Sequence, residues 1–179
     1  MSKKIIIGID PGLTGGLAAN NGGVVGSTAM PISGGEVDTI ALHALLMARP
    51  TEEWVVYLEE CGLRAGLGAK AIAVAWHNFG KIKAVLELLN IPYVLVSPQA
   101  WKKRVLAGMD WKNMKVEIKS GKNKGKFRTV KNTQAPETYC RRMFPEAAQR
   151  VLEQPKKAHS GQFDAMCLMR FGEMEEGHK

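Results

Sequence analysis

The opening of the chain constrains its fold more than any other stretch. Lys4–Ile9 is a β-branched, apolar run that ends at Asp10-Pro11-Gly12, which predicts a buried strand followed by a tight bend. Leu17–Ala19 and Val24–Thr28 then flank Asn20–Gly23, which predicts a β-hairpin. A carboxylate at the end of a buried strand is costly unless something pairs with it. Asp10 therefore either caps the bend or belongs to a functional site.

The remainder of the chain alternates between strand and helix patterns. Apolar runs predict two further strands, at Trp54–Leu58 and Tyr93–Val96. Ser97-Pro98 marks the start of a helix, and other helices are expected at Glu36–Arg49, Ala69–Leu89, Thr133–Met143 and Gly161–Phe171. Such an order indicates an α/β fold, a mixed sheet flanked by helices. The 179 residues fit a single domain, placed at 1–172, with a basic insertion at about 108–131 and a polar tail at 173–179.

Positive charge is concentrated in one segment. The chain has 25 Lys and Arg against 17 Asp and Glu, a net charge of +8, which favours a polyanionic partner. Residues 101–131 contain eleven of these basic residues and only two acidic ones, Asp110 and Glu117. Within this segment, Val116–Val130 alternates and turns at glycines, which predicts a two-stranded ribbon with a basic tip. Such a ribbon can follow a phosphate backbone without reading sequence, although a solvated surface explains the charge as well.

Aromatic residues are interleaved with the basic ones. Trp101, Trp111 and Phe127 lie in the same segment, and aromatic rings between basic residues are typical of surfaces that stack on bases or pack on sugars. The segment is therefore a candidate nucleic-acid contact.

Acidic residues emerge from apolar elements at three distant places in the chain. Besides Asp10, Glu59 and Glu60 follow the strand at Trp54–Leu58, and Asp164 lies within the apolar helix at Gly161–Phe171. Each acid alone is explained by a turn or a salt bridge. Together they suggest oxygen ligands for a hard divalent cation such as Mg²⁺, and two such ions can activate a water and stabilise a leaving oxygen.

Several other classes of protein are disfavoured. The chain has no P-loop pattern, no good match to the dinucleotide fingerprint and no His/Cys cluster suited to zinc. Cys61, Cys140 and Cys167 are scattered, which argues for a reducing compartment. No apolar run is long enough for a membrane span or a signal-peptide core, so we expect a cytoplasmic protein without a membrane partner.

Five sequence blocks resemble the RuvC-type Holliday-junction resolvases, in particular the phage and bacterial RuvC-like branch of the ribonuclease H-like superfamily. The first block, Ile5–Gly16, also occurs in sugar kinases and actin-like ATPases, so the specificity comes from the order of all five. The other four blocks are Tyr57–Glu60, Ile91–Lys103, Lys131–Pro145 and the stretch from His159 onward. The resemblance implies a ribonuclease H-like mixed five-stranded sheet in which an antiparallel hairpin joins parallel strands, flanked by helices.

The resemblance also implies a metal-dependent endonuclease that uses Mg²⁺, with Mn²⁺ as a substitute. Asp10, Glu59 and Asp164 would be the metal ligands, with Glu60 nearby. The family usually supplies a further acid a few residues before the last one, where this chain has Ser160 and Gly161. His159 is the candidate to replace it, as a ligand or a proton-transfer group, although an ordinary loop histidine is the simpler interpretation.

As substrate, the resemblance implies branched DNA, a four-way junction cut by a homodimer through paired nicks with water attacking phosphorus. The helix at Ala69–Leu89, with Gly80 as a point of close approach, is the candidate dimer face, and ordinary core packing is the alternative. The candidate DNA-binding residues come from the loop after the second strand and from the basic segment: Arg64, Lys102, Lys103, Lys119, Lys122, Lys124, Lys126, Arg128 and Lys131.

Three other functions stay open at this point. One is a ribonuclease H-like nuclease that acts on flaps, forks or RNA–DNA hybrids. Another is a junction-binding protein whose catalytic set has decayed at Ser160. The third, an actin-like ATPase, needs two such domains and is disfavoured by 179 residues.

Overall fold

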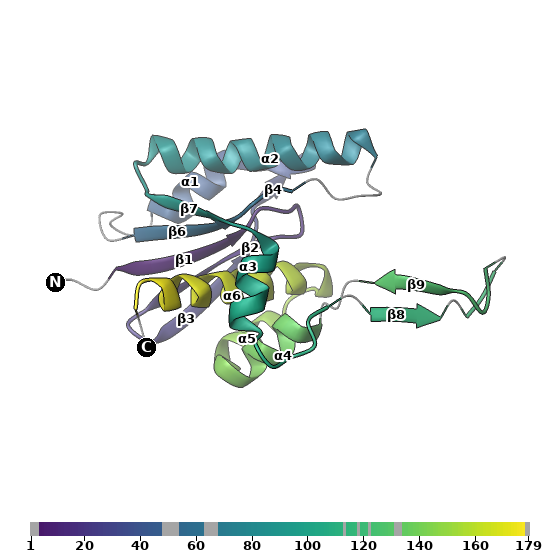
Figure 1. Ribbon diagram of the computed structural model, residues 1–179. Coiled ribbons are helices and arrows are strands. Elements are labelled where there is room, and N and C mark those ends of the chain that lie inside the picture. Colours follow the sequence, from purple (N-terminus) through teal and green to yellow (C-terminus); the bar gives the residue numbers. More distant parts are fainter. Residues whose placement is uncertain are drawn as a thin grey trace.

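A five-stranded mixed sheet forms the centre of the molecule (Figure 1). The computed structural model describes residues 4–47, 54–62, 68–112, 114–117, 119–121, 123–130 and 134–177. The strand order is β3-β2-β1-β6-β7, with β1 parallel to β6 and β6 parallel to β7, while β2 is antiparallel to both of its neighbours. The bounds are Ile5–Asp10 (β1), Gly16–Asn21 (β2), Val24–Ala29 (β3), Trp54–Glu59 (β6) and Tyr93–Val96 (β7). The predicted fold is therefore confirmed.

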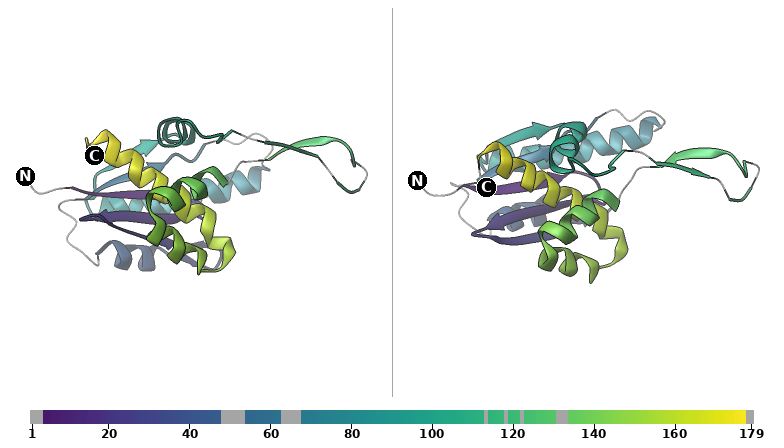
Figure 2. Two further views of the ribbon diagram at one scale, coloured as in Figure 1. Left: turned by 90° about the horizontal axis from the view of Figure 1, so that it is seen from below. Right: turned by 60° about the horizontal axis from the view of Figure 1, so that its bottom comes forward.

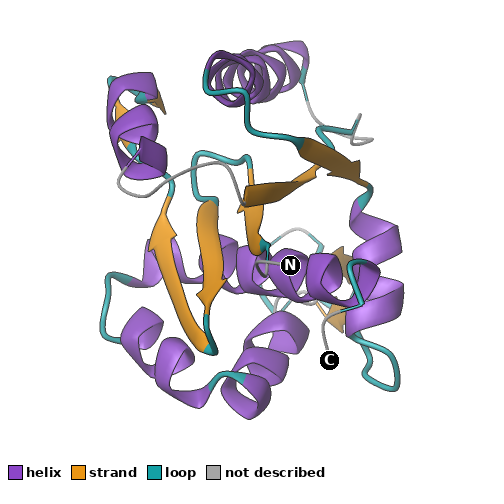
Figure 3. Cartoon of the chain, turned by 90° about the vertical axis from the view of Figure 1, so that its left-hand side faces the viewer, coloured by secondary structure: helices purple, strands orange, loops and turns teal. Residues whose placement is uncertain are grey.

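Helices cover both faces of this sheet (Figures 2 and 3). On one face lie α1 (Thr39–Met47) and α2 (Ala69–Leu88). On the other lie α3 (Pro98–Val105), α4 (Gln134–Met143), α5 (Pro145–Leu152) and α6 (His159–Glu175), with a short 3-10 turn, η1 (Lys156–Ala158), before α6. Successive residues of a strand point to opposite faces, so Ile6 packs toward α6 whereas Ile7 packs toward α1 and α2. Both faces of β1 and β6 are thus buried, which explains their unbroken apolar sequences.

The hairpin forms where the glycines predict it. β2 and β3 are joined at Gly22 and Gly23, which have φ values of 59° and 94°. Two successive residues with positive φ make the turn whose twist matches that of paired strands, and glycine adopts this conformation at little cost.

The helix predicted at Glu36–Arg49 begins later than expected. Glu36–Val37 forms a short strand, β5, which pairs with β4 (Ile32–Ser33), and α1 begins at Thr39. The Asp38 carboxylate accepts hydrogen bonds from the backbone N–H groups of Ile40 and Ala41, at 3.1 and 3.0 Å. An aspartate in this position satisfies N–H groups that a helix start leaves unpaired, so it sets the boundary.

The other helices match the sequence patterns with two extensions. Ser97 caps α3 as expected, since its hydroxyl oxygen accepts a hydrogen bond from the Ala100 N–H. A further helix, α5, follows Phe144. α6 continues to Glu175, so the predicted polar tail does not begin at 173. Glu173 is buried there because its carboxylate accepts hydrogen bonds from Asn20 and Arg170.

The basic ribbon forms in the predicted region. β8 (Met114–Glu117) and β9 (Phe127–Val130) pair antiparallel and form a sheet of their own. Figures 1 and 2 show this ribbon extending away from the body of the molecule. It leaves the body at the end toward which β1 and β6 point.

Candidate active site

Two of the predicted acids lie side by side at the ends of adjacent parallel strands. The β1–β6 register pairs Ile9 with Leu58, so the next residues, Asp10 and Glu59, end neighbouring strands at the same edge of the sheet. Both line a cleft of about 700 Å³ between these strand ends and the first half of α2. Glu60 also lines the cleft and is exposed, whereas Glu59 is buried. Strand pairing alone brings Asp10 and Glu59 together, as the sequence predicts.

The indole of Trp101 holds one oxygen of Glu59. Its Nε1 donates a hydrogen bond to Glu59 Oε2 at 2.7 Å, and the ring is fully buried in the first turns of α3. The expectation that Trp101 stacks on bases is therefore wrong, because no part of this ring reaches the surface. A buried carboxylate needs a donor, and Trp101 supplies it while fixing the orientation of the Glu59 side chain.

The third acid is carried by α6, which packs against β1 at backbone distance. A Cβ atom on Gly8 would overlap the Ala165 carbonyl oxygen and the Met169 nitrogen. A Cβ atom on Gly161 would overlap the Thr14 carbonyl oxygen and Gly15. Asp164 is buried on the helix between these two contacts, which flank the end of β1. This packing places Asp164 on a helix that crosses close to Asp10, although Asp164 does not line the cleft.

α3 and α6 also bring a positive charge toward Asp164. Burial is the main reason that the pKa of the Cys167 thiol is raised well above its usual value. Asp164 raises the same pKa further and Lys102 lowers it, so both charges act on this thiol. Lys102 Nζ lies 5.0 Å from the centre of the Trp101 ring. Lys102 therefore lies over the ring that binds Glu59, and its charge acts on the same thiol as that of Asp164.

The described side chains do not form a preformed metal-binding site. Among the residues that the structure describes, no three His, Cys, Asp or Glu side chains are grouped so that they could hold a metal ion. Asp10, Glu59 and Asp164 each make interactions with other groups. The pairing of β1 with β6 thus places Asp10 next to Glu59. The role of Asp10, Glu59 and Asp164 as metal ligands stays a prediction.

The structure separates His159 from the acids. His159 Nε2 donates to the Gln154 carbonyl oxygen at 2.7 Å, and its ring meets Phe163 edge-on. It precedes Asp164 by five residues, which places the two on different sides of a helix with 3.6 residues per turn. The next two positions carry no acid, since they are Ser160, which is exposed, and Gly161. At Gly161 there is no room for any side chain.

The candidate DNA-binding residues fall into three groups. Lys102 is half-buried and Lys103 is exposed on α3, close to the site. Lys119, Lys124 and Lys126 are exposed near the tip of the ribbon. Arg64, Lys122, Lys131 and the side chain of Arg128 lie outside the described residues. Phe127 is 67% exposed on the ribbon, while Trp111 packs against the core.

Gly80 does not approach another element within the chain. A Cβ atom built there meets nothing within 4 Å among the described residues, so the predicted close approach of Gly80 to a second copy of the chain stays a prediction. Trp76 and Val74 of the same helix are exposed large apolar residues. The use of α2 as a dimer face stays a prediction.

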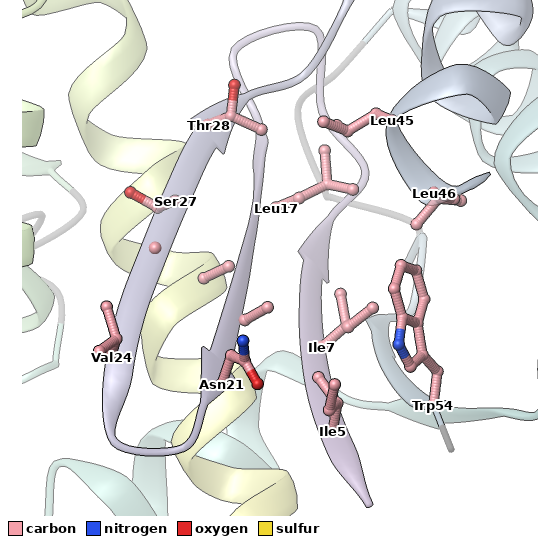
Figure 4. A pocket seen from close by; sticks show the side chains of 13 residues that line it. Ile5, Ile7, Leu17, Asn21, Val24, Ser27, Thr28, Leu45, Leu46 and Trp54 are labelled. Carbon is pink, nitrogen blue, oxygen red and sulfur yellow. The ribbon is translucent and has the colours of Figure 1, made fainter. Parts of the chain in front are cut away.

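A second pocket lies away from the acids (Figure 4). It has a volume of about 400 Å³, and β1, β2, β3 and α1 line it with mostly apolar side chains such as Ile7, Leu17 and Leu46. Trp54 closes one side, and its buried Nε1 has no hydrogen-bond partner among the described residues. None of the described residues that line this pocket is charged, and they do not supply the chemistry of a nuclease site.

Comparison with known structures identifies the fold. The chain superimposes on T. thermophilus RuvC in complex with a Holliday junction substrate with a TM-score of 0.57, covering 98% of this chain and 97% of the other at 15% identity. The chain has the RuvC fold. A second T. thermophilus RuvC structure gives a TM-score of 0.50 at 19% identity, with 97% of each chain covered.

Sequence comparisons add nothing to this result. No family model matches the chain, and no curated protein matches its sequence. The RuvC-like, ribonuclease H-like fold therefore rests on three-dimensional similarity, in agreement with the sequence blocks. No helix in the described ranges is both long and apolar enough to cross a membrane.

Proposed function

We propose that this protein is a divalent-metal-dependent endonuclease that nicks branched DNA, with the four-way junction as its preferred substrate. The pairing of Asp10 and Glu59 at one edge of a RuvC-like sheet carries this proposal, because the neighbouring solved structure of that fold holds a Holliday junction. The excess of basic residues supports a nucleic-acid partner. A homodimer, joined through α2, would present two such sites to two strands.

The donor atoms near the site fit a hard divalent cation. Asp10, Glu59 and Asp164 offer carboxylate oxygens, the ligands that Mg²⁺ and Mn²⁺ prefer, and the described part of the site offers no sulfur–nitrogen set for zinc. When bound, the metal would polarise the phosphate and lower the pKa of an attacking water. These three residues are the proposed ligands.

The chain itself contributes orientation and charge. Trp101 donates to one oxygen of Glu59 and so fixes the orientation of this carboxylate. Lys102 and Lys103 place positive charge beside the acids, where it attracts a phosphate. Lys119, Lys122, Lys124, Lys126, Arg128, Lys131 and Arg64 are proposed as further phosphate contacts. His159 is held by Gln154, so we assign it no step in the chemistry.

Replacement of Asp10 by Asn tests the proposal. With labelled four-way junction, fork and linear duplex in Mg²⁺, we expect the wild type to nick the junction fastest and D10N to lose about a hundredfold or more of the rate. Junction binding should persist in D10N. The matched control is D110N, at an exposed position beyond α3, which should cleave at the wild-type rate. Equal cutting of linear duplex, or full activity of D10N, contradicts the proposal.

A non-catalytic function is the second candidate. The observation that favours it is the lack of a formed three-ligand group among the described side chains, together with Gly161 in place of a further acid. Titration calorimetry with Mn²⁺ separates the two: the endonuclease binds the ion and D10N weakens this binding. Tight junction binding without metal uptake or nicking supports the non-catalytic candidate.

A further inference from the structure

We propose that the β8–β9 ribbon is an arm that grips a duplex branch of the DNA substrate outside the active site, and so makes affinity depend on the length of that branch. The inference rests on the proposed function for the identity of the substrate. The ribbon would be a second DNA contact region, separate from the acids, and its length would set how far along the branch this contact extends.

The ribbon holds almost all of the molecule's excess charge. Residues 112–131 contain eight basic residues and one acidic residue, whereas the remaining 159 residues contain seventeen basic and sixteen acidic ones. Lys119, Lys124 and Lys126 are exposed around the tip. Like charges this close along the chain repel one another, and a polyanion relieves the repulsion while the lysines release counterions that are condensed on it.

The ribbon is anchored only at its base. Leu106 is fully buried, and Met109 and Trp111 pack against the core just before β8 begins. Beyond this base, β8 and β9 pair with each other, and in the described ranges neither packs extensively on another element. An isolated two-stranded hairpin is marginally stable in water, so the body gains little from this insertion. A binding role explains why so exposed and so charged a segment is present.

The position of the ribbon relates it to the candidate site. It leaves the body at the end where β1 and β6 finish, which is the edge that carries Asp10 and Glu59 (Figure 1). α3, which supplies Trp101 to Glu59, leads directly into its base. DNA held at the acids is therefore next to the root of the ribbon, and a branch that leaves the site on this side runs along it.

The length of the ribbon sets the reach of this contact. From Met114 to the turn at Gly121 an extended chain covers about 25 Å. This distance corresponds to about seven base pairs along a duplex, at 3.4 Å per base pair. Backbone contacts of this kind carry no sequence preference. The exposed ring of Phe127 begins β9, directly after the exposed Lys126.

The test compares junctions that differ only in branch length. Binding is measured in Ca²⁺ or without metal, on four-way junctions with branches of about 4 base pairs, each closed by a hairpin loop, or about 20 base pairs, so that only the longer branches span the ribbon. We expect the wild type to bind the long-branched junction at least about tenfold more tightly. The double variant K124A/K126A should reduce this preference about fivefold or more, and should lower the slope of log affinity against log salt by about one for each lysine that contacts a phosphate.

A charge-matched control separates a local contact from a general loss of charge. K4A/K83A removes the same two charges at the N-terminus of β1 and in the last part of α2, at the end of the molecule opposite to the ribbon. This control should keep the wild-type preference for long branches. If K124A/K126A keeps that preference, or if the control loses as much, the ribbon does not hold DNA. Because the readout is binding, this failure differs from the absence of nicking that would overturn the proposed function.

Discussion

The β1–α6 contact and the β8–β9 ribbon are built in opposite ways, and each serves a different part of the proposed function. In the first, backbones touch across glycines, Asp164 is buried, and the residues of α6 from Gly161 to Met169 are buried. In the second, two strands extend into solvent with exposed lysines and an exposed phenylalanine. The difference indicates a division of labour. Chemistry at phosphorus needs ligands held rigidly, whereas affinity for a charged polymer needs reach.

The contact at Gly161 should be the most sensitive point of the body. We expect G161A to lose about 3 kcal/mol or more of unfolding free energy, because the added methyl group overlaps the backbone of Thr14 and Gly15 and neither is a flexible side chain. Urea unfolding monitored by circular dichroism measures this loss. The control is G80A in α2, where the methyl group meets nothing and removal of a helical glycine should stabilise by about 0.5–1 kcal/mol. Equal stability of the two variants would refute the close packing of α6 on β1.

The hydrogen bond between Trp101 and Glu59 should come second in size. W101F leaves a buried carboxylate oxygen without its donor and also removes ring volume, so we expect a loss of about 2–3 kcal/mol in urea unfolding at neutral pH. W76F, at a half-exposed ring of α2, should stay within about 0.5 kcal/mol of the wild type. A W101F variant as stable as W76F would mean that Trp101 does not support the site.

Shortening the ribbon should have the smallest effect on the fold. Replacement of residues 119–126 by a two-residue Asn-Gly turn removes no buried side chain, so we expect the unfolding free energy of the body to change by no more than about 0.5 kcal/mol. Thermal and urea unfolding give the comparison, and the far-ultraviolet spectrum should keep the helix signal of the wild type, because the replaced residues lie between β8 and β9. A large loss of stability would show that the ribbon is part of the folding unit and would remove the contrast with the β1–α6 contact.

Much of this architecture follows from local patterns. The apolar runs that become β1 and β6, the glycine turn of the hairpin and the Ser97-Pro98 helix start are signals within a few residues of one another, and each appears where expected. The placement of Asp10 next to Glu59 also follows, because parallel strands end at the same edge of a sheet. At the start of α1 the sequence contains the capping residue, Asp38, but the predicted helix began about one turn too early, at Glu36.

The tertiary structure alone decided how the site is completed. An indole nitrogen and a carboxylate that are 42 residues apart, such as Trp101 and Glu59, meet only because α3 docks beside β6. An acidic side chain does not fit at position 161, because the backbone of Thr14 and Gly15 occupies that space. Sequence patterns report propensity and burial over short windows, and they carry no information about which distant surfaces come into contact. The sequence therefore predicted the strands, the charge and the paired acids. The burial of Trp101, the contact of His159 with Gln154 and the projection of the ribbon beside the site are consequences of packing.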